Sequence, residues 1–309
     1  MAMANKWYRD YASWLAEKFP GMKVQKLSVD AGFSCPNRDG TISTGGCIYC
    51  DNRSFTPSYC NPAQSVAQQL EEGRRFFSRK YPQMRYMAYF QSFTGTHTAA
   101  IDHLRALYNE AARQPDVAGI IIGTRPDALP ARVIDLLEEI NHTTPVIVEI
   151  GAETSHDRTL RLINRCHTWK CVEEAIHSLS SRGIECGLHL IAGLPGESRE
   201  DILLTVERCC NLPIESIKLH QLQVIRHTLL HRMWESGEIE LTPFTLEEYI
   251  DLCAEVVEHV AGRVVIERFL ASAPPDMVVA PRWGLKNYQF SHLLLRELER
   301  RHPEGLLRG

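Results

Sequence analysis

The chain of 309 residues has no long hydrophobic run and no large excess of charge of one sign. No stretch reaches the roughly 18 consecutive apolar residues of a membrane-spanning helix. Residues 1–20 carry mixed charges where a secretory signal has an apolar core. We therefore expect no membrane segment. The formal net charge of −4 argues against a uniformly basic, nucleic-acid-binding surface, although a local basic patch remains open.

Cysteine is not scarce, since the chain has ten. Without a secretory signal, this number is typical of thiols and metal ligands in the cytoplasm, not of a disulfide framework. Cys47 and Cys50 form a Cys-x2-Cys pair on a glycine-rich loop, and Cys35 precedes them by an eleven-residue gap. Such a pair is typical of a zinc half-site, a redox dithiol or an iron-sulfur cluster. Cys60 would supply the fourth ligand that zinc needs.

Apolar runs alternate along the chain with stretches of helical spacing. Runs of this length are typical of parallel strands that are buried on both faces. Six strand-to-helix units predict an α/β fold, a partial (β/α)6 barrel of the TIM type with its chemistry at the carboxyl ends of the strands. The strands are expected at residues 24–31, 85–92, 119–123, 145–150, 184–191 and 216–224.

Three parts follow from this pattern. Residues 1–22 form an N-terminal extension with a short helix, residues 23–224 form the barrel, and residues 225–309 form a C-terminal extension. In the last part a helix begins at a capping box of Thr245 and Glu248, and a short strand and a final helix follow. We expect these elements to close the open side of the barrel and to shape the substrate site.

Five motifs stand in order on these elements: the cysteine loop, GTRPD, EIGAETSHDRTLRLINRCH, LHLIAGLPGES and IKLHQLQVIRHTLL. Through them the chain resembles the radical S-adenosylmethionine (SAM) superfamily from Lys23 to about Lys286. More closely, it resembles the YhcC-type branch. That branch is related to the catalytic subunit of elongator and to the oxygen-independent coproporphyrinogen oxidases.

The resemblance implies a 4Fe-4S cluster bound by Cys35, Cys47 and Cys50, whose fourth iron binds SAM. Reduction by an external flavodoxin or ferredoxin would cleave SAM to methionine and a 5′-deoxyadenosyl radical, which takes a hydrogen atom from the substrate. Eleven residues separate the first two cysteines where the commonest superfamily form has three; this spacing matches the long-loop form of the branch. Cys60 falls outside the pattern and is interpreted as a structural cysteine.

The resemblance also assigns contacts to SAM. Arg165 matches an arginine that meets the SAM carboxylate, with a surface position on its helix as the alternative. Glu153 stands where relatives carry a glutamine that meets the ribose hydroxyls; a carboxylate accepts those hydrogen bonds but donates none. His189 matches a ribose-side polar position, with a satisfied core histidine as an equal alternative.

Four further residues complete the SAM site that the resemblance implies. Gly193 and Leu194 belong to the GLPGE turn, where the backbone approaches the adenine. Gln91 and Ser92 follow the second strand, at the position where the superfamily holds the methionyl amino group. We therefore expect all four beside the cysteine loop.

Five residues are expected to contact the substrate. Arg125 and Asp127 follow the third strand, and Asp127 is alternatively the cap of the next helix. Arg268, Trp283 and Lys286 resemble basic and aromatic residues of the branch. An indole beside cations suits an unpaired RNA base, although packing explains Trp283 equally well.

Kinship with the elongator subunit makes tRNA, modified at its wobble uridine, the leading substrate, with a small metabolite or a tetrapyrrole as the alternative. In the RNA case Arg125, Arg268 and Lys286 are expected to contact phosphates. The basic stretch Arg74–Lys80 is interpreted as a solvated face. A hypothesis of another class is a zinc- or redox-dependent RNA-binding module without radical chemistry.

Overall fold

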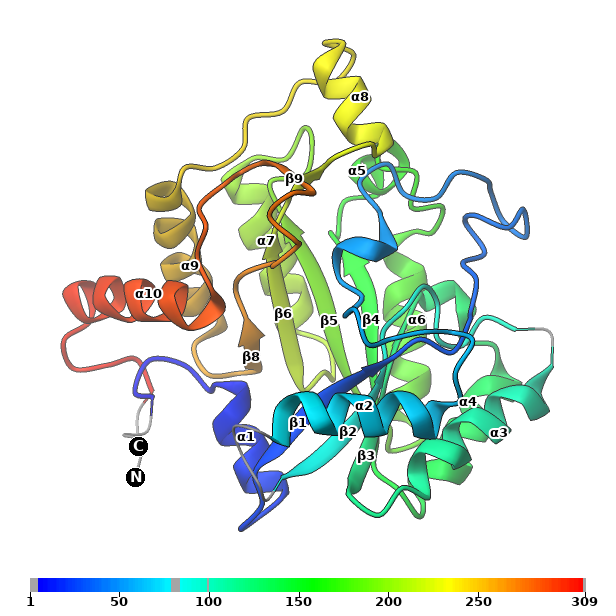
Figure 1. Cartoon of the computed structure of the whole chain (residues 1–309). Coiled ribbons are helices and arrows are strands. Elements are labelled where there is room, and N and C mark those ends of the chain that lie inside the picture. Colours follow the sequence, from blue (N-terminus) through cyan, green and yellow to red (C-terminus); the bar gives the residue numbers. More distant parts are fainter. Residues whose placement is uncertain (1–4, 79–83, 99, 308–309) are drawn as a thin grey trace.

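A computed structural model describes residues 5–78, 84–98 and 100–307 of the chain. Seven parallel strands form one curled sheet in the order β1-β2-β3-β4-β5-β6-β8 (Figure 1). All eight residues of β4 and the last six of β3 are buried, as expected for strands covered on both faces. The strands are β1 (Val24–Val29), β2 (Arg85–Phe90), β3 (Val117–Thr124), β4 (Val146–Glu153), β5 (Glu185–Ala192), β6 (Ser216–Gln221) and β8 (Val265–Arg268).

Helices cover the outer face of the curled sheet, and their apolar sides pack on it in one large core (Figure 1). Because each helix returns the chain to the start of the next strand, all carboxyl ends of the strands meet at one end of the sheet. The helices that follow β1 to β5 are α2 (Val66–Ser78), α3 (Ile101–Ala112), α4 (Ala131–Asn141), α5 (Asp157–Leu162) with α6 (Trp169–Ser180), and α7 (Arg199–Cys210).

The partial α/β barrel is confirmed, but the count of six strands is wrong. β8 lies in the predicted C-terminal extension and pairs in parallel with β6, which makes it the seventh strand. The extension therefore continues the sheet by one strand. Its other elements are β7 (Val224–Ile225), α8 (Leu229–Glu235), α9 (Leu246–Val260), β9 (Val278–Ala280) and α10 (Asn287–Arg301).

The N-terminal segment lies on the free side of β8. The Ile266 backbone N–H donates to the Arg9 carbonyl at 2.8 Å, and α1 (Tyr11–Lys18) follows directly. The Asp10 side chain caps this helix by accepting from the Ser13 backbone N–H at 2.9 Å. Residues from the two ends of the chain thus lie side by side at one edge of the sheet.

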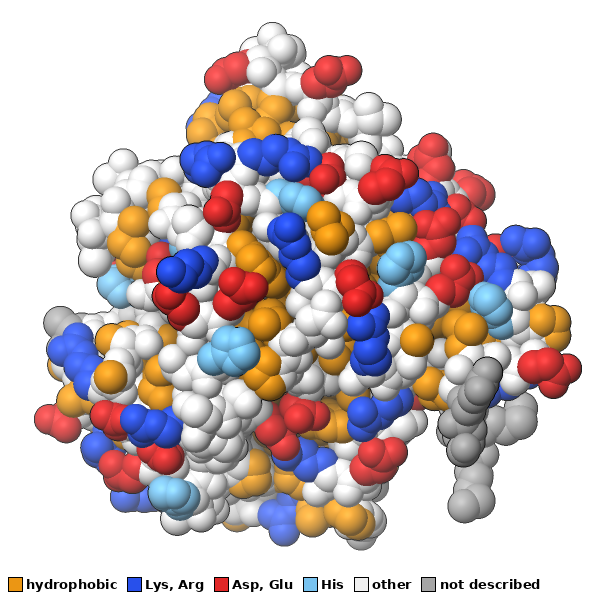
Figure 2. Space-filling view, turned by 180° about the vertical axis from the view of Figure 1, so that it is seen from behind, with side chains coloured by type: hydrophobic (Ala, Val, Ile, Leu, Met, Phe, Trp, Pro, Cys, Tyr) orange, Lys and Arg blue, Asp and Glu red, His pale blue; other side chains and the backbone are white. Residues whose placement is uncertain are grey.

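The surface carries both signs of charge. On the face seen in Figure 2, acidic and basic side chains are interspersed. Arg74 forms ion pairs with Glu71 and Asp116, and Arg75 with Glu71, in line with a solvated face; Arg79 and Lys80 lie outside the described residues. No helix in the described part of the chain is long and apolar enough to cross a membrane.

A layer of charged side chains crosses the inside of the curled sheet. Lys26 on β1 contacts Glu149 at 2.5 Å and Glu267 at 2.7 Å, and Lys218 contacts the same two carboxylates at 2.9 and 3.0 Å. The Tyr89 hydroxyl donates to Glu149 at 2.6 Å. β1 and β8 are the two edges of the sheet, so the Lys26–Glu267 pair joins edges that share no backbone hydrogen bonds.

The charges in this layer determine one another's protonation. Burial alone would raise the pKa of Glu149, but Lys218 and Lys26 outweigh it and hold that pKa well below its usual range. Burial, together with the Lys218 charge, lowers the pKa of His189, whose Nε2 lies 2.6 Å from Glu149. We therefore describe Glu149 as a carboxylate and His189 as a neutral ring.

The first prediction concerns this layer. Glu149→Ala leaves Lys26 and Lys218 buried with one carboxylate between them, and is expected to lower the free energy of unfolding by about 3 to 5 kcal/mol in urea titrations. Glu174→Ala, which removes an exposed pair with Lys170, serves as control and is expected to change it by less than about 0.5 kcal/mol. Because the pKa of Glu149 is lowered in the folded state, its stabilising effect is present at neutral pH and declines below about pH 4. Equal stabilities of the two variants would contradict this account of the layer.

Candidate active site

A cavity of about 370 Å³ lies at the carboxyl ends of the strands, beneath the cysteine loop. It brings together residues from the loop and from the ends of β2 to β6 and β8, which are far apart in sequence. Its walls include Cys35, Cys47, Cys50, Gln91, Arg125, Glu149, Gly151, Glu153, Arg165, His189, His220, Gln221 and Arg268.

Hydrogen bonds within the cysteine loop hold it in its conformation. The Arg38 backbone N–H donates to the Cys35 carbonyl at 2.7 Å, and the Cys50 N–H donates to the Cys47 carbonyl at 3.0 Å. The Arg38 guanidinium reaches across and donates to the Cys50 carbonyl at 2.6 Å. Gly46 has a φ of +79°, and a Cβ there would lie 2.7 Å from Arg38 Nε, so glycine is required on both grounds.

The three thiols share one cavity but are not arranged as ligands of a single ion. Among the described residues, no three His, Cys, Asp or Glu side chains converge as they would around one metal ion. Cysteines that each bind a different iron of a cluster are spaced further apart than the ligands of one zinc ion. Burial, and then the neighbouring Cys47, raise the pKa of Cys50 to about 11.

Cys60 lies apart from this cavity. Its Sγ donates to the Ser28 carbonyl at 3.2 Å, and burial raises the pKa of its thiol to about 12. The contact with β1 agrees with the interpretation of Cys60 as a structural cysteine.

Arg165 points into the cavity and is only 7% exposed, which contradicts the alternative of a surface helix position. Its Nη2 donates to the Gly151 carbonyl at 2.6 Å and lies 3.2 Å from Glu153 Oε1, while its Nη1 lies 3.5 Å from Cys47 Sγ. Its Nε is buried without a hydrogen-bond partner among the described residues. A buried guanidinium with an unused donor suits an anionic group such as the carboxylate of SAM.

Arg125 contacts the backbone of Arg165. Its guanidinium pairs with both oxygens of Asp127, at 2.8 and 2.6 Å, and also donates to the Arg165 carbonyl at 2.8 Å. Arg125 is 2% exposed and lines the cavity, and its Nη1 is buried without a hydrogen-bond partner among the described residues. Its contact with a substrate phosphate stays a prediction, while its hydrogen bond to the Arg165 carbonyl fixes the backbone of that residue. The carboxylate of Asp127 holds this arginine, so Asp127 is not the side-chain cap of the next helix.

His189 and His220 lie on the floor of the cavity, with ring centroids 6.0 Å apart. His189 is held by Glu149, as described above. His220 accepts a hydrogen bond from Arg268 Nε at 3.0 Å, and burial together with the Arg268 charge holds its pKa well below its usual range. Both rings are therefore neutral hydrogen-bonding groups beside the cysteines.

Other predicted residues lie outside the walls of this cavity. Ser92 is 3% exposed, with its Oγ 3.4 Å from that of Thr56. Gly193 lies against Phe244. Leu194 is buried in an apolar cluster below the turn. These three residues do not line the cavity, so their contacts with SAM stay predictions.

Of the three substrate contacts expected in the C-terminal extension, one lines the cavity and two do not. Trp283 stacks on Tyr249 with ring centroids 5.2 Å apart, which favours its alternative as a packing residue. Lys286 is exposed at the start of α10. Arg268 lines the cavity, as expected of a substrate contact.

Sequence reasoning missed three residues of the site. Arg38 lies in the gap between Cys35 and Cys47, and its position between two predicted ligands was the available signal. His220 and Gln221 belong to the IKLHQLQV motif, where every second side chain of a strand points to the same face. That alternation would have placed one of these two inside the barrel, although not beside Arg268.

The sequence pattern of the radical SAM superfamily matches residues 39–209, and that of the radical SAM C-terminal domain matches residues 214–300. Protein YhcC of Escherichia coli K12 is 39% identical over 264 residues, which cover 85% of this chain and 83% of YhcC. The tRNA uridine(34) acetyltransferase of Methanocaldococcus infernus is 27% identical over 197 residues, which cover 62% of this chain and 35% of that protein.

Two solved structures share the fold. Elp3 of Methanocaldococcus infernus, with an N-terminal deletion, has a TM-score of 0.65 at 17% identity over 91% of this chain and 63% of its own. Coproporphyrinogen III oxidase (HemN) of Escherichia coli, a radical SAM enzyme, has a TM-score of 0.52 at 14% identity over 80% of this chain and 54% of its own. At such low identities the likeness concerns the fold alone.

The match to residues 39–209 covers more than half of the chain, and YhcC is similar across most of both proteins. The matched region includes Cys47, Cys50 and Arg165, which meet in the cavity. The chain belongs to the radical SAM superfamily, and it is a radical SAM enzyme whose cofactors are a 4Fe-4S cluster and SAM.

Proposed function

We propose that Cys35, Cys47 and Cys50 hold the cluster, that SAM binds beside them, and that the enzyme modifies a base of tRNA, the wobble uridine in the first instance. The observation that carries the proposal is the single cavity in which the three thiols face Arg165 and a ring of polar side chains. When bound, the cluster and SAM supply a radical that abstracts hydrogen from the substrate.

In this proposal the residues of the cavity bind SAM and orient it. Arg165 offers its guanidinium to the SAM carboxylate and is itself held by Gly151 and Glu153. Gln91 offers its side-chain oxygen to the amino group of SAM, which leaves its amide nitrogen free, and Glu153 offers its carboxylate to the hydroxyl groups. His189 is neutral and fixed by Glu149, so it offers a hydrogen bond without adding charge.

The choice of tRNA rests on sequence kinship. The acetyltransferase whose name specifies uridine 34 of tRNA is similar to this chain over 197 residues, although it is 27% identical. Because this chain corresponds to 35% of that protein, we transfer only the substrate class and not the acetyl transfer. An external electron donor of the flavodoxin or ferredoxin type completes the proposal.

The second prediction tests the ligands. After anaerobic reconstitution, Cys35→Ala, Cys47→Ala and Cys50→Ala combined are expected to abolish bound iron and sulfide, because each thiolate holds a separate iron. Cys60→Ala is the matched control and is expected to keep the iron content of the wild type. Equal iron in the triple variant and the wild type would overturn the assignment.

The third prediction concerns Arg165. Loss of one charged hydrogen bond costs about 1.5 to 3 kcal/mol, so Arg165→Ala is expected to weaken SAM binding roughly 10- to 150-fold in equilibrium dialysis of the reconstituted protein. Arg161→Ala, an exposed arginine on α5, is the control and is expected to bind SAM as the wild type does. An Arg165→Ala variant with unchanged affinity would remove this residue from the SAM site.

The fourth prediction concerns the substrate. The reduced enzyme with SAM is incubated with total tRNA and, separately, with a small-metabolite extract. 5′-Deoxyadenosine above the uncoupled background is expected with tRNA, together with a modified nucleoside detected by mass spectrometry. Stimulation by the metabolite fraction alone would contradict the RNA proposal and leave the radical chemistry intact.

A further inference from the structure

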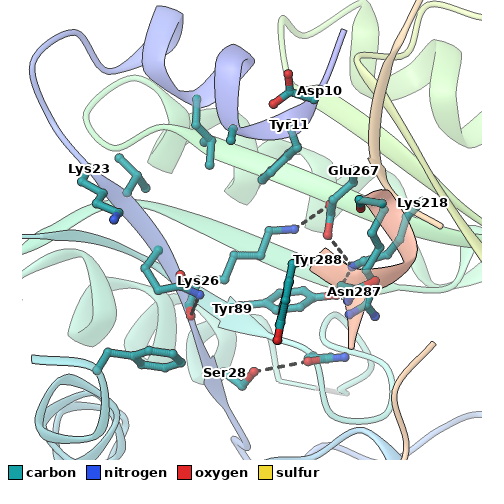
Figure 3. Close-up of a pocket in the computed structure, with 18 of the residues that line it drawn as sticks. Asp10, Tyr11, Lys23, Lys26, Ser28, Tyr89, Lys218, Glu267, Asn287 and Tyr288 are labelled. Atoms are coloured by element: carbon teal, nitrogen blue, oxygen red, sulfur yellow. Dashed lines mark hydrogen bonds and ion pairs between the residues drawn. The ribbon is translucent and has the colours of Figure 1, made fainter. Parts of the chain in front are cut away.

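A second and larger cavity, of about 1060 Å³, lies on the open side of the curled sheet. Its walls come from α1, β1, α2, β8 and α10, and it lies between the two edge strands β1 and β8 (Figure 3). The charged layer of Lys26, Lys218 and Glu267 forms its inner wall. We call this space the lateral cavity.

The lateral cavity adjoins the cavity of the cysteines. Ser28, Pro57, Tyr89, Gln91 and Arg268 line both spaces. The smaller cavity, at about 370 Å³, is of the size that one small ligand occupies. With SAM in that space, a substrate would reach the reacting centre from the lateral cavity, across the five shared residues.

The shared wall offers hydrogen-bond donors. Arg268 makes no salt bridge with a carboxylate in the described part of the chain, and its Nε donates to neutral His220. Gln91 uses its Oε1 to accept from Ser28 Oγ at 3.3 Å, whereas its amide nitrogen has no partner among the described residues. A guanidinium and an amide nitrogen on the wall of one cavity suit a group with two carbonyl oxygens, such as a uracil ring.

The outer rim of the lateral cavity carries exposed aromatic rings. Phe76 on α2 and Tyr288 on α10 are each 69% exposed, more than any other large hydrophobic side chain in the described part of the chain. Tyr288 projects into the cavity from the side of α10 (Figure 3). Tyr59 lies behind Phe76, with ring centroids 6.3 Å apart. Exposed rings at the mouth of a cavity are platforms on which unpaired bases stack.

We propose that the lateral cavity receives unpaired nucleotides of the RNA substrate, with the reacting pyrimidine at Arg268 and Gln91 and its neighbours stacked on Tyr288 and Phe76. This inference rests on the proposed function and names the surface through which the substrate binds. Stacking and carbonyl recognition, not a broad basic surface, then carry the affinity, which agrees with the net charge of −4.

The test uses the reconstituted full chain, SAM and the anticodon stem-loop of a tRNA with uridine at the wobble position, followed by fluorescence anisotropy over a range of salt concentrations. Tyr288→Ala and Phe76→Ala are each expected to weaken binding about 5- to 150-fold, because one stacked base contributes about 1 to 3 kcal/mol. The salt slope is expected to stay that of the wild type, since no phosphate contact is lost. Tyr288→Phe keeps the ring, and Leu204→Ala removes an exposed side chain from α7; both are expected to bind as the wild type does.

Two outcomes separate the proposals. Failure of the wild type to bind any RNA would overturn the proposed function. Tight binding by the wild type that Tyr288→Ala and Phe76→Ala leave unchanged would overturn the lateral cavity alone. A second measurement needs no variant: a 5-iodouridine next to the wobble position, cross-linked to the wild type by light, is expected to label peptides around Tyr59, Phe76 or Tyr288. Labels on the opposite face of the sheet would contradict the inference.

Discussion

The rest of the structure depends on the ion pairs among two lysines and two glutamates inside the curled sheet. Lys26 and Glu267 stand on the two edge strands, and their contact joins edges that no backbone ladder connects. Glu149 and Lys218 complete the layer from β4 and β6. A closed barrel fills its interior with aliphatic layers. Here an ionic layer crosses the interior and lies between the two cavities.

The polar interior also explains how the active site is oriented. Glu149 ends in the charged layer and at the same time holds His189 in the cavity of the cysteines. On the other wall, Asp127 holds Arg125, and Arg125 holds the backbone of Arg165. Each group that faces the cofactor site is therefore fixed by a buried partner behind it. These buried partners fix the positions of His189 and Arg165 before any ligand binds.

The sequence predicted the architecture well where buried strands show as apolar runs. It predicted a short strand at the position of β8 but not that this strand joins the main sheet, because its four residues, ending in Glu267 and Arg268, carry no pattern that identifies β6 as the neighbour. The charged layer was hidden for a related reason: Lys26 and Lys218 each stand singly within otherwise strand-like segments. Their meeting depends on the register of β1, β6 and β8, which no local pattern reveals. The cysteines were recognisable because the three lie on one loop, whereas the hydrogen bond from Arg125 to the Arg165 carbonyl spans forty positions.

The central claim is that three cysteines hold a cluster with one iron left open to SAM in the cavity beside Arg165. Electron paramagnetic resonance of the reduced, reconstituted protein tests it most directly, because the signal of a cluster changes when a ligand binds one of its irons. We predict the signal of a reduced 4Fe-4S cluster whose g values shift on addition of SAM. A cluster signal that stays unchanged while SAM binds to the protein would contradict the account.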